Sequence, residues 1–281
     1  MGATQSASDA TIAELHYLVP TGKKPVAYTF EPPPGAPWQS GDYEARRVPI
    51  VDARARGVEA SVDREGFALV DALTEVGDFW DEDRVRAIYY PEAERLLQSA
   101  LGAEKAFIFD HTRRRRVGPG PLHSGRAAEG APREPVGRVH VDHTERSGPR
   151  RLRDFLGDEA DLWLKGRVAI VNVWRPLFGP LDDAPLALCD ARSVAPRELV
   201  ACDLVFRDRV GETYSVTYSP EHRWSYYPRM RREEVLLLKC YDSRQDVARF
   251  SPHTAFDDPA TPPDARPRES IELRSFVYFP E

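Results

Sequence analysis

The residue types best suited to chemistry lie in one short segment near the middle of the chain. His140, Val141 and Asp142 place an imidazole and a carboxylate two positions apart. In an extended strand, residues i and i+2 point to the same side, so we expect the two side chains to aim at one point. A distant histidine would complete a facial set of two imidazoles and one carboxylate. Such a set leaves three positions open on an octahedral Fe(II) ion.

Two downstream histidines compete for the third ligand position. His253 lies between a strand expected at 235–241 and an arginine-bearing strand near the end of the sequence. His222 is farther from that last strand and precedes a segment that resembles a helix. We therefore expect His140, Asp142 and His253 to bind the metal, and we keep His222 as the alternative distal ligand.

An Arg-x-Ser motif on the expected last strand indicates a keto-acid co-substrate. Arg268 follows His253 after fourteen intervening residues, and Ser270 projects to the same face as Arg268. 2-Oxoglutarate chelates iron through its ketone and near carboxylate, and an arginine fork binds its far carboxylate better than a lysine does. We expect Arg268 and Ser270 to bind 2-oxoglutarate, with Arg274 and Lys239 as alternatives for the arginine.

Four further residues are candidates for the wall of a substrate pocket. Asn172 and Trp174 share one face of the strand expected at 168–174, and Arg175 follows it directly. His111, beside Asp110, is the fourth candidate, although it could instead be a structural hydrogen-bonding group.

Length and composition favour one large domain. The chain has 281 residues, is 41% hydrophobic and carries a net charge of −6, so neither disorder nor a coiled coil fits. With 39 lysines and arginines against 45 acidic residues, charge does not indicate a nucleic-acid partner. The run of four arginines at 113–116 is interpreted as a solvated loop.

The sequence also lacks signals for membranes or secretion. No apolar run approaches the roughly 20 residues that a membrane span needs, and residues 1–10 do not resemble a secretory signal. The three cysteines have no C-x-x-C spacing, so we expect them to be reduced and mostly buried. We expect a cytoplasmic protein.

The order of expected elements predicts a mainly β (α+β) fold. We expect an extended lead-in at 1–60, helix on both sides of Pro91 within 81–101, a flexible loop at 117–137 and a short helix at 150–164. The expected strands lie at 106–110, 168–174, 186–189, 199–206, 213–218, 235–241 and 271–279. Many strands without strand–helix alternation indicate an antiparallel double-sheet barrel in a single domain, 1–281, with flanking helices.

Seven motifs, spread from about residue 85 to the end, together carry a resemblance to a known family. They are Phe109-Asp110-His111-Thr112-x-Arg114, His140-Val141-Asp142, Asn172-Val173-Trp174-Arg175-Pro176-Leu177, Trp224-x-Tyr226-Tyr227-Pro228-x-Met230, Lys239-x-Tyr241-Asp242-Ser243, Pro252-His253-Thr254-Ala255-Phe256-x-Asp258-Pro259 and Arg268-x-Ser270-Ile271-Glu272-x-Arg274. The chain resembles the bacterial and fungal hydroxylase/desaturase group that includes the cephamycin-biosynthesis hydroxylase and the fungal gibberellin desaturase. That group is itself similar to Fe(II)/2-oxoglutarate dioxygenases.

The resemblance implies a double-stranded β-helix (jelly-roll or cupin-like) core and a tailoring oxidation of a small molecule in specialised metabolism. The implied cofactors are Fe(II), 2-oxoglutarate and O₂, with ascorbate as a candidate stimulant. Hydroxylation, desaturation and ring closure all remain open, whereas the carboxylate of Asp142 argues against halogenation. Two other classes are kept: a cupin-like binding protein or isomerase, and an accessory subunit that works with a partner tailoring enzyme such as a methyltransferase.

Overall fold

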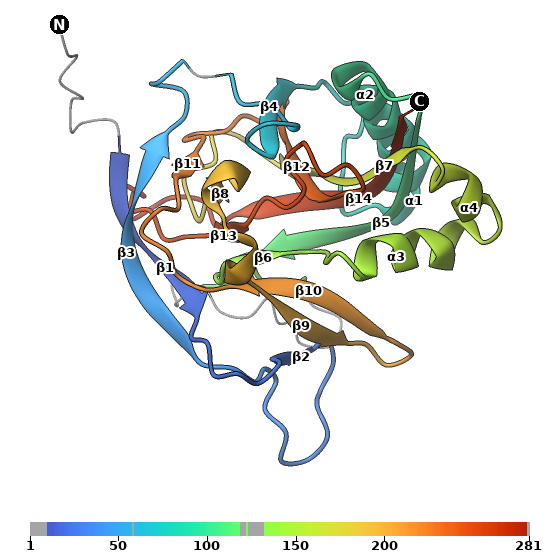
Figure 1. Cartoon of the computed structure of the whole chain (residues 1–281). Helices are drawn as coiled ribbons and strands as arrows, with labels where there is room; N and C mark the ends of the chain where they lie inside the picture. The colour runs from blue at the N-terminus through green and yellow to red at the C-terminus, as the bar shows by residue number, and fades with distance from the viewer. Residues whose placement is uncertain (1–9, 58, 119–121, 123–131, 280–281) are drawn as a thin grey trace, which may run out of the picture.

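The computed structural model describes residues 10–57, 59–118, 122 and 132–279. Two β-sheets form its framework, and Figure 1 shows helices α1 and α2 on one side of the molecule and the β9–β10 hairpin on the opposite side. Much of the loop expected at 117–137 lies outside the described residues.

The larger sheet has nine strands in the order β1-β3-β11-β8-β13-β6-β10-β9-β2. Its strands are β1 (Ala10–Leu18), β2 (Val26–Tyr28), β3 (Tyr43–Asp52), β6 (His140–Val141), β8 (Leu186–Cys189), β9 (Leu199–Val205), β10 (Val210–Val216), β11 (Trp224–Tyr226) and β13 (His253–Ala255). Two very short strands, β6 and β13, pair with each other at its centre. The segment expected as an extended lead-in at 1–60 thus supplies three strands of this sheet, β1, β2 and β3.

The smaller sheet has five strands in the order β4-β12-β7-β14-β5, and all of its neighbouring strands are antiparallel. Its strands are β4 (Phe67–Asp71), β5 (Lys105–Arg115), β7 (Arg167–Pro176), β12 (Glu234–Asp242) and β14 (Glu269–Phe279). Every residue of β12 is buried. Because successive side chains of a strand point to opposite faces, both faces of the sheet must be covered there.

Different elements cover the two faces of the smaller sheet. On the outer face, Val173 and Leu273 pack with Val85 and Leu97 of the helical segment 82–101. On the inner face, Trp174 and Leu236 pack with residues of the larger sheet. The two sheets thus face each other across a shared interior, and this interior holds the polar side chains described below.

The helices flank this double sheet. They are α1 (Glu82–Arg84), a π-helical turn (Val85–Tyr89), α2 (Tyr90–Leu101), α3 (Ser147–Leu156) and α4 (Glu159–Trp163), with single 3₁₀ turns at Ala191–Ser193 and Pro196–Glu198. Helix lies on both sides of Pro91, as expected, and continues through it without interruption. Pro91 lies in the first turn of α2, where its missing N–H and fixed φ are tolerated.

The four arginines at 113–116 do not form a solvated loop. Arg113, Arg114 and Arg115 end strand β5 and Arg116 follows it, so successive side chains point to opposite faces and contact different partners. Arg113 donates to the carbonyl oxygens of Phe79 and Trp80, whereas Arg114 donates to the carbonyl oxygen of Glu134. A run of like charges at the end of a strand is thus divided between the two faces of the sheet.

Candidate metal centre and substrate cavity

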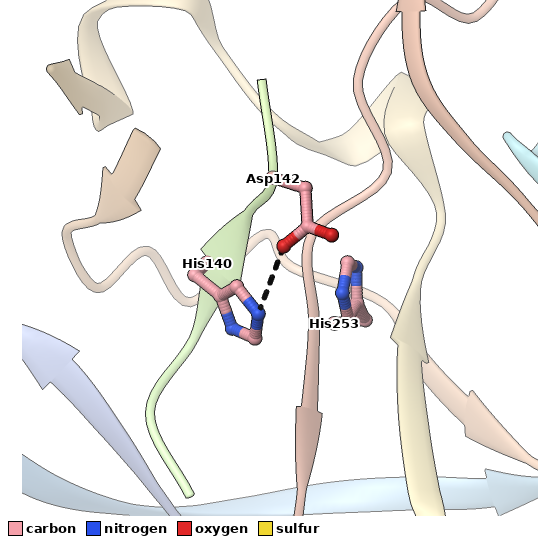
Figure 2. Close-up of side chains that lie close together, drawn as sticks. All are labelled: His140, Asp142 and His253. Atoms are coloured by element: carbon pink, nitrogen blue, oxygen red, sulfur yellow. Dashed lines mark ion pairs between the residues drawn. The ribbon is translucent and has the colours of Figure 1, made fainter. Parts of the chain in front are cut away.

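Strand pairing brings three potential metal ligands together. His140 on β6 lies opposite His253 on β13, and Asp142 follows β6 on the same side as His140. The ligand atoms of these three residues all lie within 4.8 Å of one another. Figure 2 shows the two rings and the carboxylate converging on one point.

Backbone carbonyl oxygens fix the orientation of both imidazoles. His140 Nδ1 is 2.8 Å from the carbonyl oxygen of Arg138, and His253 Nδ1 is 3.1 Å from that of Ser251. A carbonyl oxygen only accepts, so each Nδ1 carries the proton. Each Nε2 is left with the lone pair that a metal requires.

The Asp142 carboxylate is held by its other oxygen. Asn172 Nδ2 and Arg274 Nε donate to Oδ2 over 2.9 and 3.1 Å, while Oδ1 lies 3.5 Å from His140 Nε2. Burial alone would raise the pKa of Asp142, but the charge of Arg274 holds that pKa well below its usual range. The carboxylate is therefore ionised and presents Oδ1 beside the two imidazoles.

The donor set fits Fe(II). Two neutral imidazole nitrogens and one carboxylate oxygen are the combination found in nonheme iron oxygenases, and they leave positions for a co-substrate. Burial, together with the nearby His140, lowers the pKa of His253 to about 4. The ring is thus neutral, and available as a ligand, at physiological pH.

A cavity of about 950 Å³ opens onto this centre. His140 and Asp142 line it, together with His111, Phe109 and Arg274. Its volume lies at the upper end of the range typical of small-molecule sites. The arrangement can therefore bring an organic substrate next to a metal.

Arg268 and Ser270 lie in the buried interior rather than in the wall of this cavity. Arg268 Nε donates to Ser270 Oγ over 3.2 Å and Nη1 donates to the carbonyl oxygen of Ala184 over 2.8 Å. The guanidinium also lies over the ring of Trp174. Within the described part of the chain, no carboxylate comes within ion-pair distance of this guanidinium.

Among the other predicted site residues, only His111 lines the cavity, where its Nδ1 is 2.8 Å from the Tyr90 hydroxyl. Asn172 instead bonds Asp142, and Trp174 packs beneath Arg268. Arg175 is buried on the outer face, where Nε donates to the Tyr89 hydroxyl. A strand places successive residues on opposite faces, so Arg175 cannot share the inner face of Trp174.

His222 is remote from the metal centre. Its Nε2 is 3.0 Å from Glu198 Oε2, and its ring stacks on Tyr17. The two alternatives for the keto-acid clamp are also engaged elsewhere: Lys239 pairs with Asp242 and Asp63, and Arg274 holds Asp142.

From the sequence, Asn172 was expected in the wall of the substrate pocket and Arg274 was an alternative for binding 2-oxoglutarate. Arg114 was given no role. Arg274 pairs directly with Asn172 across β14 and β7, so a correct strand alignment would have placed them together. Arg114 belongs to the first family motif and to the arginine run, but neither of these predicted its place on the inner face of β5.

A double β-sheet with two histidines and one carboxylate inside it defines the class of nonheme iron oxygenases. Comparisons with known proteins agree. The model of a family described as "Oxidoreductase/YMDC permease-like domain" matches residues 15–278. The hydroxylase/desaturase efuI of Hormonema carpetanum is 33% identical over 254 residues, covering 84% of this chain and 85% of that protein. The hydroxylase/desaturase CTB9 of Cercospora beticola is 33% identical over 261 residues, covering 84% and 78%.

A solved structure is similar over almost the full length. The iron and alpha-ketoglutarate-dependent endoperoxidase NvfI superposes with a TM-score of 0.83 at 26% identity, covering 98% of this chain and 100% of that one. The chain belongs to the Fe(II)/2-oxoglutarate-dependent hydroxylase/desaturase family. The expected double-stranded β-helix and enzyme class are confirmed, and the comparisons do not support the binding-protein and accessory-subunit alternatives.

Among the described residues, no helix is both long and apolar enough to cross a membrane.

Proposed function

We propose that His140, Asp142 and His253 hold Fe(II), and that the protein hydroxylates or desaturates a small molecule of specialised metabolism. The observation that carries this proposal is the convergence of three ligand atoms whose other polar atoms are already hydrogen-bonded. When bound, Fe(II) with 2-oxoglutarate and O₂ supplies an oxidant able to attack an unactivated C–H bond.

The chain's own residues would position these reactants and exclude water. Asn172 and Arg274 fix the direction of the Asp142 carboxylate. We further propose that the Arg268 guanidinium, with Ser270 beside it, binds the far carboxylate of 2-oxoglutarate. Support comes from its burial without a carboxylate partner among the described residues, because a buried guanidinium strongly favours an anion.

A cytoplasmic location and cooperation with another tailoring enzyme stay predictions from the sequence.

Exchange of single histidines tests the ligand assignment. His253→Ala should abolish iron-dependent conversion of 2-oxoglutarate to succinate, because among the described residues His253 is the histidine whose ligand atom lies within 4.8 Å of those of His140 and Asp142. His222→Ala is the matched control and should keep that conversion, since its ring contacts Glu198 and Tyr17. Iron binding would be followed anaerobically by the charge-transfer band that 2-oxoglutarate gives on Fe(II). The reverse ranking of the two variants would refute the assignment.

A further inference from the structure

The cavity is strongly basic. Eleven lysines and arginines line it, against six aspartates and glutamates. Most of those acidic groups are already engaged: Glu82 pairs with Arg86 and Arg113, and Glu212 pairs with Lys24 and Arg146. Positive charge therefore remains on the wall after the internal ion pairs are formed.

Part of this remaining charge is concentrated in two guanidiniums from different elements. Arg151 comes from α3, and Arg209 comes from the turn between β9 and β10. Arg209 has no carboxylate within 4 Å among the residues that the structure describes, and Arg151 has only Asp154, at 3.8 Å from Nη1. Burial and the neighbouring Arg209 both lower the pKa of Arg151.

Aromatic rings hold both guanidiniums in place. The Arg209 guanidinium lies 3.7 Å from the centroid of the Phe206 ring, and that of Arg151 lies 4.3 Å from the Phe155 ring and 5.6 Å from Phe109. Stacking reduces the conformational freedom of an arginine while its N–H groups remain free to donate. Two such forks on the wall of one cavity form a prepared site for an anion.

2-Oxoglutarate does not account for this site. Its near carboxylate belongs at the metal, and its far carboxylate is assigned to Arg268, which does not line the cavity. Arg151 and Arg209 line the same cavity as the two ligands His140 and Asp142. The pair is therefore close enough to the metal centre to bind one end of a molecule whose other end is oxidised.

We propose that Arg151 and Arg209 bind an anionic group of the primary substrate, a carboxylate or a phosphate, whose apolar body lies against Phe109 and Phe206. This inference rests on the proposed function, because it names the class of molecule that this oxygenase accepts. Neutral analogues that lack the anionic group should bind poorly.

Calorimetry with small aromatic probes tests the proposal. Anaerobic holoenzyme with Fe(II) and saturating 2-oxoglutarate would be titrated with 1-naphthoate, with 1-naphthyl phosphate and with neutral 1-naphthamide. At least one anion should bind about ten-fold or more tightly than the amide, which corresponds to roughly 1.4 kcal/mol. The ranking of naphthoate and naphthyl phosphate distinguishes a carboxylate from a phosphate substrate.

Two variants and two matched controls locate the effect. Arg151→Gln and Arg209→Gln should each reduce the preference for the anion several-fold. Arg153→Gln on the same helix and Arg207→Gln on the same turn should keep it, because neither residue lines the cavity. Equal affinity for anion and amide in the wild type, including no measurable binding of either, overturns the proposal, as does an equal loss in the controls. Succinate formation by the same preparation reports separately on the proposed function.

Discussion

Asp142 can offer one oxygen in a defined direction because its other oxygen is already bound. A carboxylate without such partners rotates and changes its mode of binding, which weakens a metal site. Asn172 and Arg274 prevent this by donating to the same oxygen from neighbouring strands. The geometry of the proposed metal centre thus depends on Asn172 and Arg274, which would not touch the metal.

The role of Asn172 can be tested by removing its amide. Asn172→Ala should weaken Fe(II) binding by about ten- to a hundred-fold, the usual effect of losing a partner of a metal ligand. Ser275→Ala is the control, because Ser275 is buried near Asn172 but bonds only the carbonyl oxygen of Val171. Anaerobic titration with Fe(II) measures both. Unchanged affinity in Asn172→Ala would show that Arg274 alone suffices.

The assignment of Arg268 gives a second prediction at this scale. Arg268→Lys keeps the charge but loses the planar fork, and should raise the apparent KM for 2-oxoglutarate by roughly ten- to a hundred-fold, the cost of one charge-assisted hydrogen bond. Ser270→Ala should have a smaller effect. Arg266→Lys is the matched control, since Arg266 is exposed and pairs with Glu269. Steady-state kinetics that show no change for Arg268→Lys would contradict the assignment.

Among the elements, α3 depends on a close approach that only glycine permits. A Cβ on Gly148 would lie 2.6 Å from Cγ of Tyr241, too close for any ordinary contact. The helix therefore packs directly on the end of β12, and this packing sets the position of Arg151 one turn later. Because residue 148 is glycine, α3 can lie close enough to β12 to place Arg151 in the cavity wall.

Gly148→Ala should accordingly destabilise the protein by about 1–3 kcal/mol, as overpacking of a tight contact does. The matched control is Gly77→Ala, because a Cβ on Gly77 would meet nothing within 4 Å and its φ is not left-handed. Urea unfolding of both variants measures the difference. Equal stability of the two would mean that Tyr241 moves aside at little cost.

The core elements were predictable from the sequence, whereas the short and polar ones were not. Val168–Trp174 and Val235–Tyr241 are almost continuous apolar runs, and they are strands β7 and β12. β3 was missed because it contains two arginines and Pro49. β6 has only two residues, so its partners in the sheet could not be read from periodicity. The convergence of His140, Asp142 and His253 was expected from the sequence, but the partners that orient them come from strand register.

Across the whole molecule, buried neutral histidines link stability to pH. Burial lowers the pKa of both His143 and His253 to about 4, whereas an unfolded histidine titrates near 6.5. The unfolded chain therefore binds more protons than the folded one between these values. The stabilisation is fully present above about pH 6.5 and is lost as the pH falls.

Metal-free protein should lose about 1.4 kcal/mol of unfolding free energy for each of these two histidines between pH 7.5 and 5.5. His143→Gln should lose correspondingly less over the same interval, because its glutamine does not titrate. Urea unfolding with a chelator present, at both pH values, gives the comparison. The same pH dependence in wild type and His143→Gln would exclude this histidine as a source.

The direct pairing of β6 with β13 has a consequence for the motions of the protein. His140 and His253 are neighbours in space, although more than a hundred positions separate them in the chain. A metal ion bound by both would close that long loop and act as a cross-link between two strands that share few backbone hydrogen bonds. The two strands meet at a single residue pair, so the metal would add a second link between them. The supply of iron would then set how tightly the centre of the larger sheet is closed, as well as whether the enzyme can oxidise its substrate.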